Sequence, residues 1–249
     1  MANPSLESEQ SDQYSLGFIF SPMDWLNLSL DYYNIKVENN ISQVSAQTMI
    51  NKDLYPEIYG SIPEGLSIDR NPATGAIREI RTSYRNIGDL ETDGLDLRFD
   101  TNFSLGNAGA LRNMLTISYV NKYEVTDAGL QTIDYAGYLG TPDTRATLAN
   151  VWSFGDFDVS WNVNYIKGQK NPDTTNDDGE LEIGSSVGGY ATNDVQFTWN
   201  APWNGKIAIG ATNLGNRYPE LVDYDGRPWN FYLYDAYGRT TYLRYTQTF

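Results

Sequence analysis

The sequence predicts an all-β fold, an antiparallel up-and-down transmembrane β-barrel, present as a partial barrel of about nine strands. Three observations favour this fold. Apolar and polar residues alternate along segments of about ten residues, which gives each strand one apolar and one wet face. The connections between these segments are alternately short and long. Aromatic residues gather beside the short connections.

The expected strands follow the alternating segments in chain order. They cover 11–20, 25–37, 87–104, 113–125, 143–153, 157–168, 189–199, 206–216 and 238–249. The apolar positions include Leu26, Leu28 and Leu30 early in the chain, Leu95, Leu97 and Phe99 next, then Phe157, Val159 and Trp161, then Val195, Phe197 and Trp199, and finally Leu243 and Tyr245. Their neighbours are mostly Asp, Asn, Ser, Thr or Gln, so the second face is expected to line a watery interior.

The connections indicate how the strands are oriented. Short connections are expected at 21–24, 105–112, 154–156 and 200–205, and long ones at 38–86, 126–142, 169–188 and 217–237. In an up-and-down arrangement, every second connection lies at the same end of the strands. The pattern therefore predicts short periplasmic turns and long extracellular loops.

The first long connection is expected to contain a small helix. Val44, Met49 and Ile50 lie at roughly helical spacing within 42–52, and serines are available as caps. The segment 77–85 alternates apolar and charged residues, and we expect it to extend the following strand beyond the membrane.

Composition excludes several classes of function. The 249 residues carry a formal net charge of -15, which would repel nucleic-acid phosphates, so no nucleic-acid partner is expected. The absence of Cys and His removes thiolate sites and the commonest general base. No stretch approaches the roughly 18 apolar residues of a membrane-spanning helix.

A soluble antiparallel sheet with one solvated face would show the same alternation. The aromatic residues beside the short connections favour the membrane, because barrels place aromatic girdles at the membrane interfaces. These residues are Phe20, Trp25, Trp152, Trp199 and Trp203. A passive porin-type barrel and a soluble β-rich carbohydrate-binding module remain alternative interpretations.

Several segments resemble a known family. The residues 213–219 read NLGNRYP, the residues 234–242 read YDAYGRTTY, and the chain ends on Phe249. The residues 91–97 and 141–145 look similar to segments that begin earlier strands in the same family. In order and spacing they resemble the C-terminal part of the β-barrel of TonB-dependent outer-membrane receptors. This resemblance implies a barrel of about 22 strands whose lumen is filled by a plug domain.

The resemblance implies that this sequence is a C-terminal portion of such a barrel. Residues 1–10 are expected to continue from an N-terminal portion outside this sequence, and residues 11–249 to form barrel wall without the plug domain. An open sheet would leave unpaired backbone groups at both edges, at several kcal/mol per group in hydrocarbon. A partial barrel is therefore expected to need the rest of its strands.

The resemblance also implies a function and partners. The expected function is TonB-energised uptake of a scarce nutrient, an oligosaccharide or a ferric siderophore, across the Gram-negative outer membrane. The expected partners are outer-membrane lipid, the ligand, and TonB and a plug domain through the missing N-terminal portion. Barrel-assembly machinery is expected to bind the C-terminal strand, with Tyr245 and Phe249 as its signal.

The last long loop is the expected ligand-contacting segment, because aromatic faces stack on sugar rings or aromatic chelators while charged groups fix orientation. The candidate residues are Asp223, Tyr224, Asp225, Arg227, Trp229, Tyr232 and Tyr234. In the alternative interpretation, the loop folds back and its aromatics pack on each other and on the rim.

No catalytic residue, cofactor or metal is expected. The acidic stretch 173–182 contains clustered carboxylates, but it fails the calcium-loop pattern, because Thr174 and Ser185 fall at the first and last ligand positions. Paired carboxylates can act as glycosidase acid and base. Nothing singles out two of the 32 acidic residues for that role, so we expect no enzyme activity.

Overall fold

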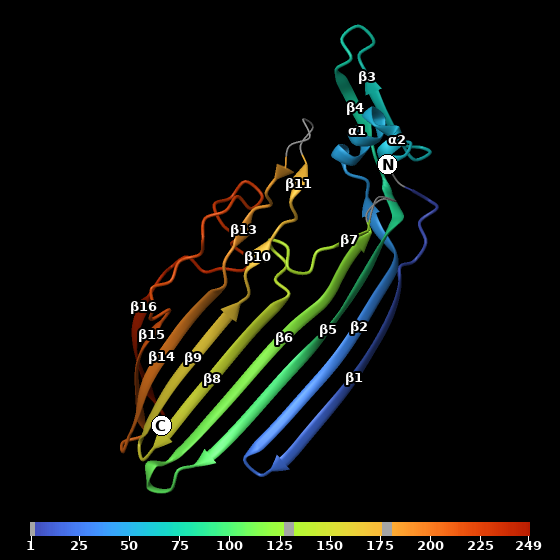
Figure 1. Cartoon of the computed structure of the whole chain (residues 1–249). Coiled ribbons are helices and arrows are strands. Elements are labelled where there is room, and N and C mark those ends of the chain that lie inside the picture. Colours follow the sequence, from blue (N-terminus) through green and yellow to red (C-terminus); the bar gives the residue numbers. More distant parts are fainter. Residues whose placement is uncertain (1–2, 127–131, 176–180) are drawn as a thin grey trace. The chain divides into compact units, whose positions relative to one another are not determined.

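A computed structural model describes residues 3–126, 132–175 and 181–249. Its main sheet has ten strands (Figure 1). Nine of them follow chain order, β1-β2-β5-β6-β8-β9-β14-β15-β16, and β7 pairs with β6. They are β1 (Gln10–Met23), β2 (Leu26–Gln43), β5 (Tyr84–Ser104), β6 (Ala110–Thr126), β7 (Thr132–Asp134), β8 (Thr144–Phe154), β9 (Phe157–Ile166), β14 (Tyr190–Ala201), β15 (Gly205–Thr212) and β16 (Thr240–Gln247).

All nine expected strands are confirmed, and neighbouring strands from β6 to β16 pair antiparallel. Among the described residues, no pairing joins β1 to β16, so the sheet is not closed into a barrel. The chain divides into two compact units. Unit 1 contains 1–14, 34–92 and 122–135, and unit 2 contains 15–33, 93–121 and 136–249.

In unit 2 the register places apolar residues in a continuous row on one face. The row runs across β8, β9, β14, β15 and β16 through Trp152, Val159, Phe197, Ile209 and Leu243. Ile209 is 58% exposed and Leu243 is 74% exposed. An exposed apolar face of this extent is typical of a surface in contact with lipid.

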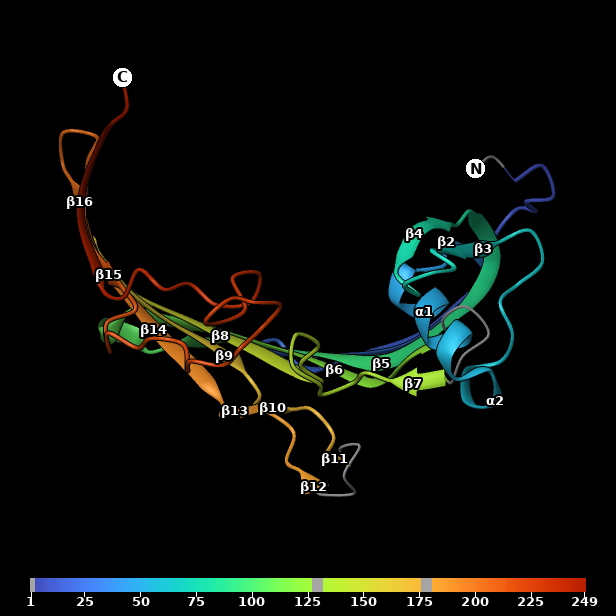
Figure 2. The same ribbon diagram turned by 90° about the horizontal axis from the view of Figure 1, so that it is seen from above.

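The opposite face of the same strands is polar. The adjacent row contains Val151, Ser160, Gln196, Gly210 and Tyr242. In Figure 2 the connection between β15 and β16 lies on one side of the sheet formed by β8, β9 and β14. That side is the polar face, because this connection and polar residues of β9 and β14 line a common cavity.

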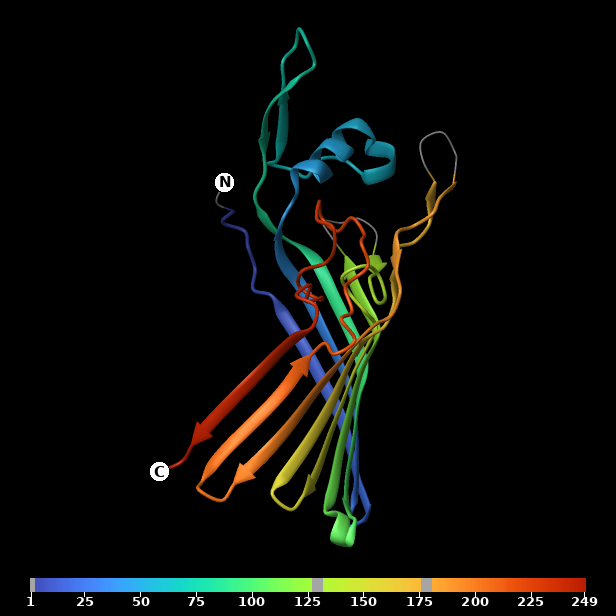
Figure 3. The ribbon, with the colours of Figure 1, turned by 90° about the vertical axis from the view of Figure 1, so that its left-hand side faces the viewer.

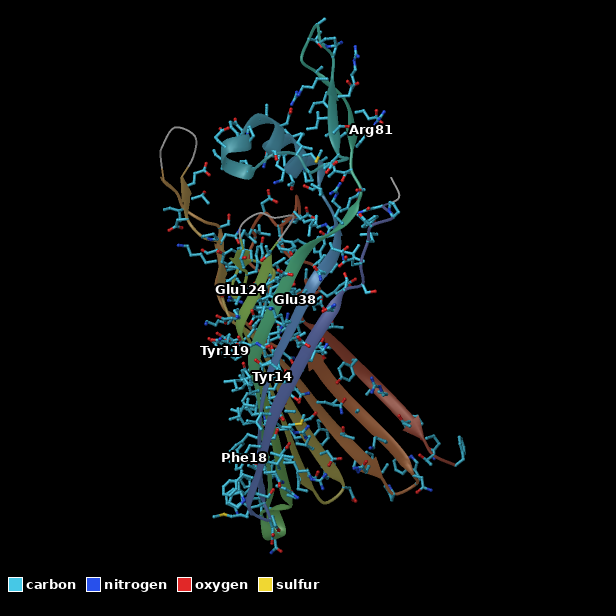
Figure 4. The ribbon with its side chains drawn as sticks, turned by 90° about the vertical axis from the view of Figure 1, so that its right-hand side faces the viewer. Tyr14, Phe18, Glu38, Arg81, Tyr119 and Glu124 are labelled. Atoms are coloured by element: carbon cyan, nitrogen blue, oxygen red, sulfur yellow. The ribbon has the colours of Figure 1, made fainter. Side chains whose placement is uncertain are left out.

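Aromatic rings cluster at the short-turn end of unit 2, as expected for an interfacial girdle. The turns that join β8 to β9 and β14 to β15 lie at the same end of the sheet (Figure 3). The ring centroids of Trp152 and Phe154 are 4.4 Å apart, those of Trp199 and Trp203 are 5.2 Å apart, and those of Trp25 and Phe103 are 5.0 Å apart. Phe18 on β1 stacks 6.2 Å from Phe20 (Figure 4).

One short turn depends on a glycine. The turn between β5 and β6 contains the short helix η1 (Gly106–Ala108) and then Gly109, whose φ is 90°. A Cβ on Gly109 would lie 1.9 Å from the carbonyl oxygen of Ser153. Only glycine combines this left-handed backbone with so close an approach of β8.

In unit 1 the connection between β2 and β5 folds into a small module. It contains α1 (Ala46–Leu54), α2 (Pro56–Tyr59) and a hairpin of β3 (Ser67–Arg70) and β4 (Ile77–Arg81). Val44, Met49 and Leu66 form its core, with exposed fractions of 1%, 0% and 7%. The expected helix is confirmed, with Ser45 as its N-cap accepting a hydrogen bond from Thr48 N at 3.0 Å.

The expectation that 77–85 extends the following strand holds only for Tyr84 and Arg85, since β5 begins at Tyr84. It is wrong for Ile77–Arg81, which form the separate strand β4 and pair with β3. The reason is a tight turn in which Asn71 N donates to Ala76 O at 2.8 Å, so that Ile68 and Ile80 lie opposite each other. Both isoleucines pack against the module core, and this burial favours the hairpin over an extended strand.

One ion pair joins two strands of unit 1, since Lys122 Nζ on β6 lies 2.7 Å from Glu91 on β5. Two others lie within single strands, Lys122 with Glu124 at 3.6 Å on β6 and Arg81 with Glu79 at 3.0 Å on β4. No described helix has the length and apolar character needed to cross a bilayer.

The connection between β9 and β14 contains two short antiparallel strand pairs. β10 (Gln169–Lys170) pairs with β13 (Ser186–Val187), and β11 (Thr174–Thr175) pairs with β12 (Leu181–Glu182). The described residues of this connection, 167–175 and 181–189, therefore contain two antiparallel pairings between β9 and β14.

Candidate ligand-binding site

The connection between β15 and β16, residues 213–239, begins at an anchor on the barrel wall. Asn213 N donates to the Asp194 carboxylate of β14 at 2.7 Å. The Asn213 side chain then closes the next turn, donating to Arg217 O at 2.7 Å and accepting from Arg217 N at 2.8 Å. Asn213 has a φ of 47°, which asparagine tolerates better than most residues. The loop is thus tied to the polar face from its first residue.

A tight turn follows at Tyr224–Arg227. The backbone of Tyr224 and that of Arg227 exchange hydrogen bonds of 2.9 and 3.1 Å, and both central residues have positive φ, 54° at Asp225 and 71° at Gly226. These features define a type I′ turn, for which Asp-Gly is a preferred sequence. Asp223 accepts from Gly226 N at 2.9 Å, so its carboxylate closes the turn while Asp225 lies exposed at the tip.

Arg227 leads into an aromatic cluster. Its guanidinium carbon lies 5.7 Å from the ring centroid of Phe231 and 5.8 Å from that of Tyr232, within the range of cation–π contacts. Trp229 packs edge-on against Phe231 with centroids 4.6 Å apart. A cavity of about 590 Å³ is lined by Trp229, Phe231, Tyr232, Leu233, Tyr234, Asp235, Ala236 and Tyr237.

Tyr234 lies at the centre of this lining and is 8% exposed. Its ring packs edge-on against Tyr190 with centroids 5.1 Å apart, and its hydroxyl accepts a hydrogen bond from the Gln169 amide. Burial raises the pKa of the Tyr234 hydroxyl above its usual value, which outweighs the opposing effect of the Gln169 hydrogen bond. Tyr234 therefore anchors the loop and exposes little surface.

Tyr224 contacts a different loop. Its hydroxyl lies so close to Gly140 that a Cβ there would come within 2.5 Å of it, and Gly140 has a φ of +98°. Tyr224 is half-buried as a result. The connection 213–239 is thus packed against the end of the connection between β6 and β8.

The structure places the seven predicted residues in three settings. Arg227, Trp229 and Tyr232 belong to the aromatic cluster. Asp223 and Asp225 form the turn, and Tyr224 and Tyr234 are the residues that pack inward. The cavity lining also includes Phe231, which is 49% exposed, and Tyr237, which is 88% exposed. Both could be predicted from the sequence as lining residues, because they lie in the same aromatic-rich loop. Gln169 carries no such signal.

A second cavity of about 440 Å³ lies between this connection and the polar face of the sheet. The strands contribute Asn164, Thr192 and Asp194 to its lining. Leu233, Asp235 and Tyr237 line both cavities, so one segment of the loop separates the outer aromatic cavity from an inner polar one.

The acidic stretch is only partly described, since 176–180 lie outside the described residues. At its start, Asp173 accepts from Gly184 N at 2.9 Å and pairs with Lys170 at 2.9 Å. These two groups lower the pKa of the Asp173 carboxyl. Among the described residues, no group of three acidic side chains is arranged to hold a metal ion.

The C-terminal strand ends at the short-turn end of the sheet. Tyr245 lies opposite Ile207 on the apolar face and is 57% exposed. Phe249 is separated from the last residue of β16, Gln247, by Thr248, and it is fully exposed. Thr248 N donates to Asn204 O at 3.1 Å, which holds the end of the chain beside the turn between β14 and β15.

An antiparallel sheet with an exposed apolar face, a polar face, an aromatic girdle and long connections at one end is the wall of a transmembrane β-barrel. The model of one family, described as TonB dependent receptor-like, beta-barrel, matches residues 1–214. The chain belongs to this family, and its location is the outer membrane of Gram-negative bacteria. A comparison with curated protein sequences found no match.

Solved structures of the same fold include receptors and transporters from three bacteria. A mutant of the ferric enterobactin receptor PfeA from Pseudomonas aeruginosa is 17% identical with a TM-score of 0.63, covering 99% of this chain and 32% of that one. The outer membrane transporter YddB from Escherichia coli is 13% identical with a TM-score of 0.64, covering 97% and 33%. The siderophore receptor PirA from Acinetobacter baumannii is 15% identical with a TM-score of 0.58, covering 95% and 31%.

The chain therefore spans about a third of the length of the solved structures that it matches. At these identities the likeness extends to the fold.

Proposed function

We propose that this chain is the C-terminal barrel wall and part of the extracellular rim of a receptor for TonB-energised uptake of a scarce nutrient. Family membership supports the class of transport. The observation that carries the binding role is the aromatic cavity of residues 229–237, which is fixed to the long-connection end of the wall. Residues 11–249 supply lipid-facing surface, a polar lumen wall and ligand contacts, and residues 1–10 continue from preceding barrel.

The proposal includes partners that act through other parts of the protein. A plug domain fills the lumen, and TonB delivers the energy that displaces it once the ligand is bound. Barrel-assembly machinery binds the C-terminal strand through Tyr245 and Phe249, whose exposed side chains support this role. The chain performs no covalent chemistry, so its residues act by binding and orienting the ligand.

We propose a neutral oligosaccharide as the ligand class. Two loop cations near the cavity are paired with acids, Lys167 with Asp143 at 2.8 Å and Lys170 with Asp173 at 2.9 Å. Arg227 is stacked on aromatic rings. An anionic ferric chelate would need cations that are free to face it, whereas sugar rings stack on aromatic faces and donate to carboxylates such as Asp235.

A ferric siderophore is the second candidate. The observation that favours it is that two of the matched structures are named as a ferric enterobactin receptor and a siderophore receptor. Arg227 is the loop residue that would contact such an anion, since it lies at the edge of the aromatic cluster.

Growth of a deletion strain on single carbon and iron sources distinguishes the two ligands. We expect the strain to lose uptake of one oligosaccharide class and to regain it with the complete receptor. Trp229→Ala should reduce that uptake about two- to tenfold at low ligand concentration, because a stacked aromatic pair contributes about 0.5–1.5 kcal/mol. Tyr55→Ala, at an exposed tyrosine of the helical module, is the matched control.

Loss of iron-chelate uptake alone would overturn the oligosaccharide proposal. Wild-type uptake by a Trp229→Ala receptor that is present at normal levels in the outer membrane would overturn the binding role of the cavity. A deletion strain without any uptake defect would contradict the transport function itself.

A further inference from the structure

The side chain of Gln169 is almost completely buried among the long connections, at 3% exposed. It lies on β10, in the connection between β9 and β14. Its Oε1 accepts a hydrogen bond from Gly140 N at 2.8 Å, and its Nε2 donates to the Tyr234 hydroxyl. A primary amide can accept and donate at once, so one side chain joins three connections.

Further contacts hold the same connections together. Lys170 N donates to Gly137 O at 3.0 Å, and Leu139 N donates to the Asn171 side chain at 3.2 Å. Gly188 N donates to the Glu220 carboxylate at 2.8 Å. These bonds tie the connection of Gln169 to the loop before β8 on one side and to the loop after β15 on the other.

Tyr234, which accepts the hydrogen bond from Gln169, is also one of the residues that line the aromatic cavity. Tyr234 is buried, while its neighbours Tyr232 and Tyr237 are 79% and 88% exposed and line the same cavity. The loop is therefore pinned at its centre, with its exposed rings on both sides of the pinned residue.

We propose that Gln169 is a positioning residue that clamps the three connections and holds the cavity of residues 229–237 in its binding shape before ligand arrives. This inference rests on the proposed function for the meaning of the cavity. A loop fixed in advance loses less conformational freedom when ligand binds, which strengthens binding without a new contact. Gln169 itself has almost no surface with which to touch the ligand.

Hydrogen exchange of the complete receptor, folded in detergent without ligand, tests the clamp. Gln169→Met keeps the length and volume of the side chain and removes both hydrogen-bonding groups. We expect amide exchange to rise about tenfold in two separate peptides, 136–143 and 229–237. A packing role alone would be preserved by methionine.

Gln169→Glu provides the rescue. The carboxylate can accept from Gly140 N, and it can also accept from Tyr234 if that hydroxyl becomes the donor. Exchange in both peptides should therefore be slower in Gln169→Glu than in Gln169→Met. Tyr234→Phe keeps the ring on Tyr190 and breaks one link, so it should raise exchange in 229–237 and add little to Gln169→Met.

Gln196 supplies a matched control, because its Oε1 accepts from the Tyr242 hydroxyl at 2.9 Å on the barrel wall. Gln196→Met also breaks a Gln–Tyr pair, and it should leave exchange in both loop peptides unchanged. Wild-type exchange in Gln169→Met, or a rise confined to 167–171, would overturn the clamp. If Gln169→Met fails to fold, the amide exchange rate of 229–237 in Tyr234→Phe tests the clamp. A rate above that of the wild type supports it, and an unchanged rate overturns it.

These measurements need no ligand. A receptor that takes up none of the tested nutrients would contradict the proposed function, while the exchange rates would still support or overturn the clamp.

Discussion

Tyr234 shows how one residue of an aromatic-rich loop can act as a structural anchor. Its neighbours in the cavity lining are exposed, but its own ring lies against Tyr190 and its hydroxyl is bonded to Gln169. Composition alone does not separate these roles, because tyrosine suits both a ligand platform and a buried anchor. The distinction arises from the partners that the other connections bring to it.

The burial of Tyr234 predicts an alkaline transition of the loop. Burial raises the pKa of the Tyr234 hydroxyl above the ordinary value of 10.0, so the folded loop favours the neutral phenol. The stabilisation is fully present below the unfolded pKa and is lost as pH rises through the folded pKa. Hydrogen exchange in 229–237, corrected for intrinsic rates, should therefore increase above pH 10 in the wild type.

The control for this transition is Tyr234→Phe, which has no phenol to ionise. Its corrected exchange in 229–237 should lack the alkaline rise, although its baseline is higher. An identical rise in the variant would assign the transition to another group.

At the scale of elements, the module of 44–83 is a small structure with its own core. Met49 is fully buried between Val44 and Leu66, and isoleucines of the hairpin pack around them. The helix is only nine residues long, too short to be stable in water alone. Its stability therefore depends on the core that it shares with β3 and β4.

Met49→Ala tests this dependence. Removal of a buried methionine side chain costs about 2–5 kcal/mol, which is enough to unfold a module of this size locally. We expect limited proteolysis to cleave the segment 44–83 faster while the barrel strands stay protected. Leu54→Ala, at a residue that is 54% exposed on the same helix, should leave the cleavage rate near that of the wild type.

Equal cleavage of Met49→Ala and wild type would mean that the core contributes little to the module. Cleavage of the barrel strands as well would mean that the module is coupled to the whole fold.

Across the whole sheet, one face is suited to contact with lipid and the other to contact with water, as a membrane wall requires. An apolar row runs across one face, and the adjacent row on the other face carries Ser160, Gln196 and Tyr242, whose side chains can form hydrogen bonds. In hydrocarbon the backbone of every strand must be paired, so a sheet of this kind is stable only in a closed barrel. The chain's share of its matched structures, about a third, fits a wall that other strands complete.

Substitutions on the two faces should differ in cost. Phe197→Lys places a charge on the apolar row and should destabilise the complete receptor by more than about 1 kcal/mol, because a lipid-facing lysine costs about 2–4 kcal/mol at the bilayer midplane and about 0–1 kcal/mol only near the interfaces. Ser160→Lys places the same charge on the polar row, at a residue that lies opposite Gln196. It should cost less than about 1 kcal/mol, because the ammonium remains in water.

The urea midpoint of the receptor in lipid vesicles measures both costs. A Ser160→Lys receptor as unstable as Phe197→Lys would contradict the assignment of the two faces.

A structural feature could be predicted from the sequence where it depends on interactions between residues that are close in the chain. Strands, turns and faces were predictable, because the alternation of Phe157, Val159 and Trp161 with polar neighbours is visible within a few residues. The prediction for the segment 77–85 missed the hairpin of β3 and β4, because alternating residues fit a hairpin as well as the extension of a neighbouring strand. The seven candidate ligand residues were identified from loop composition, and their ligand contact stays a prediction.

Local patterns in the sequence were enough to predict a membrane wall with one apolar face, one polar face and an aromatic-rich last loop. The exposure of each aromatic side chain and the joining of three connections by Gln169 depend on the tertiary structure. Gln169 lies 29 residues from Gly140 and 65 from Tyr234. A hydrogen bond between such distant residues leaves no periodic trace in the sequence, because it depends on where the sheet brings the loops together.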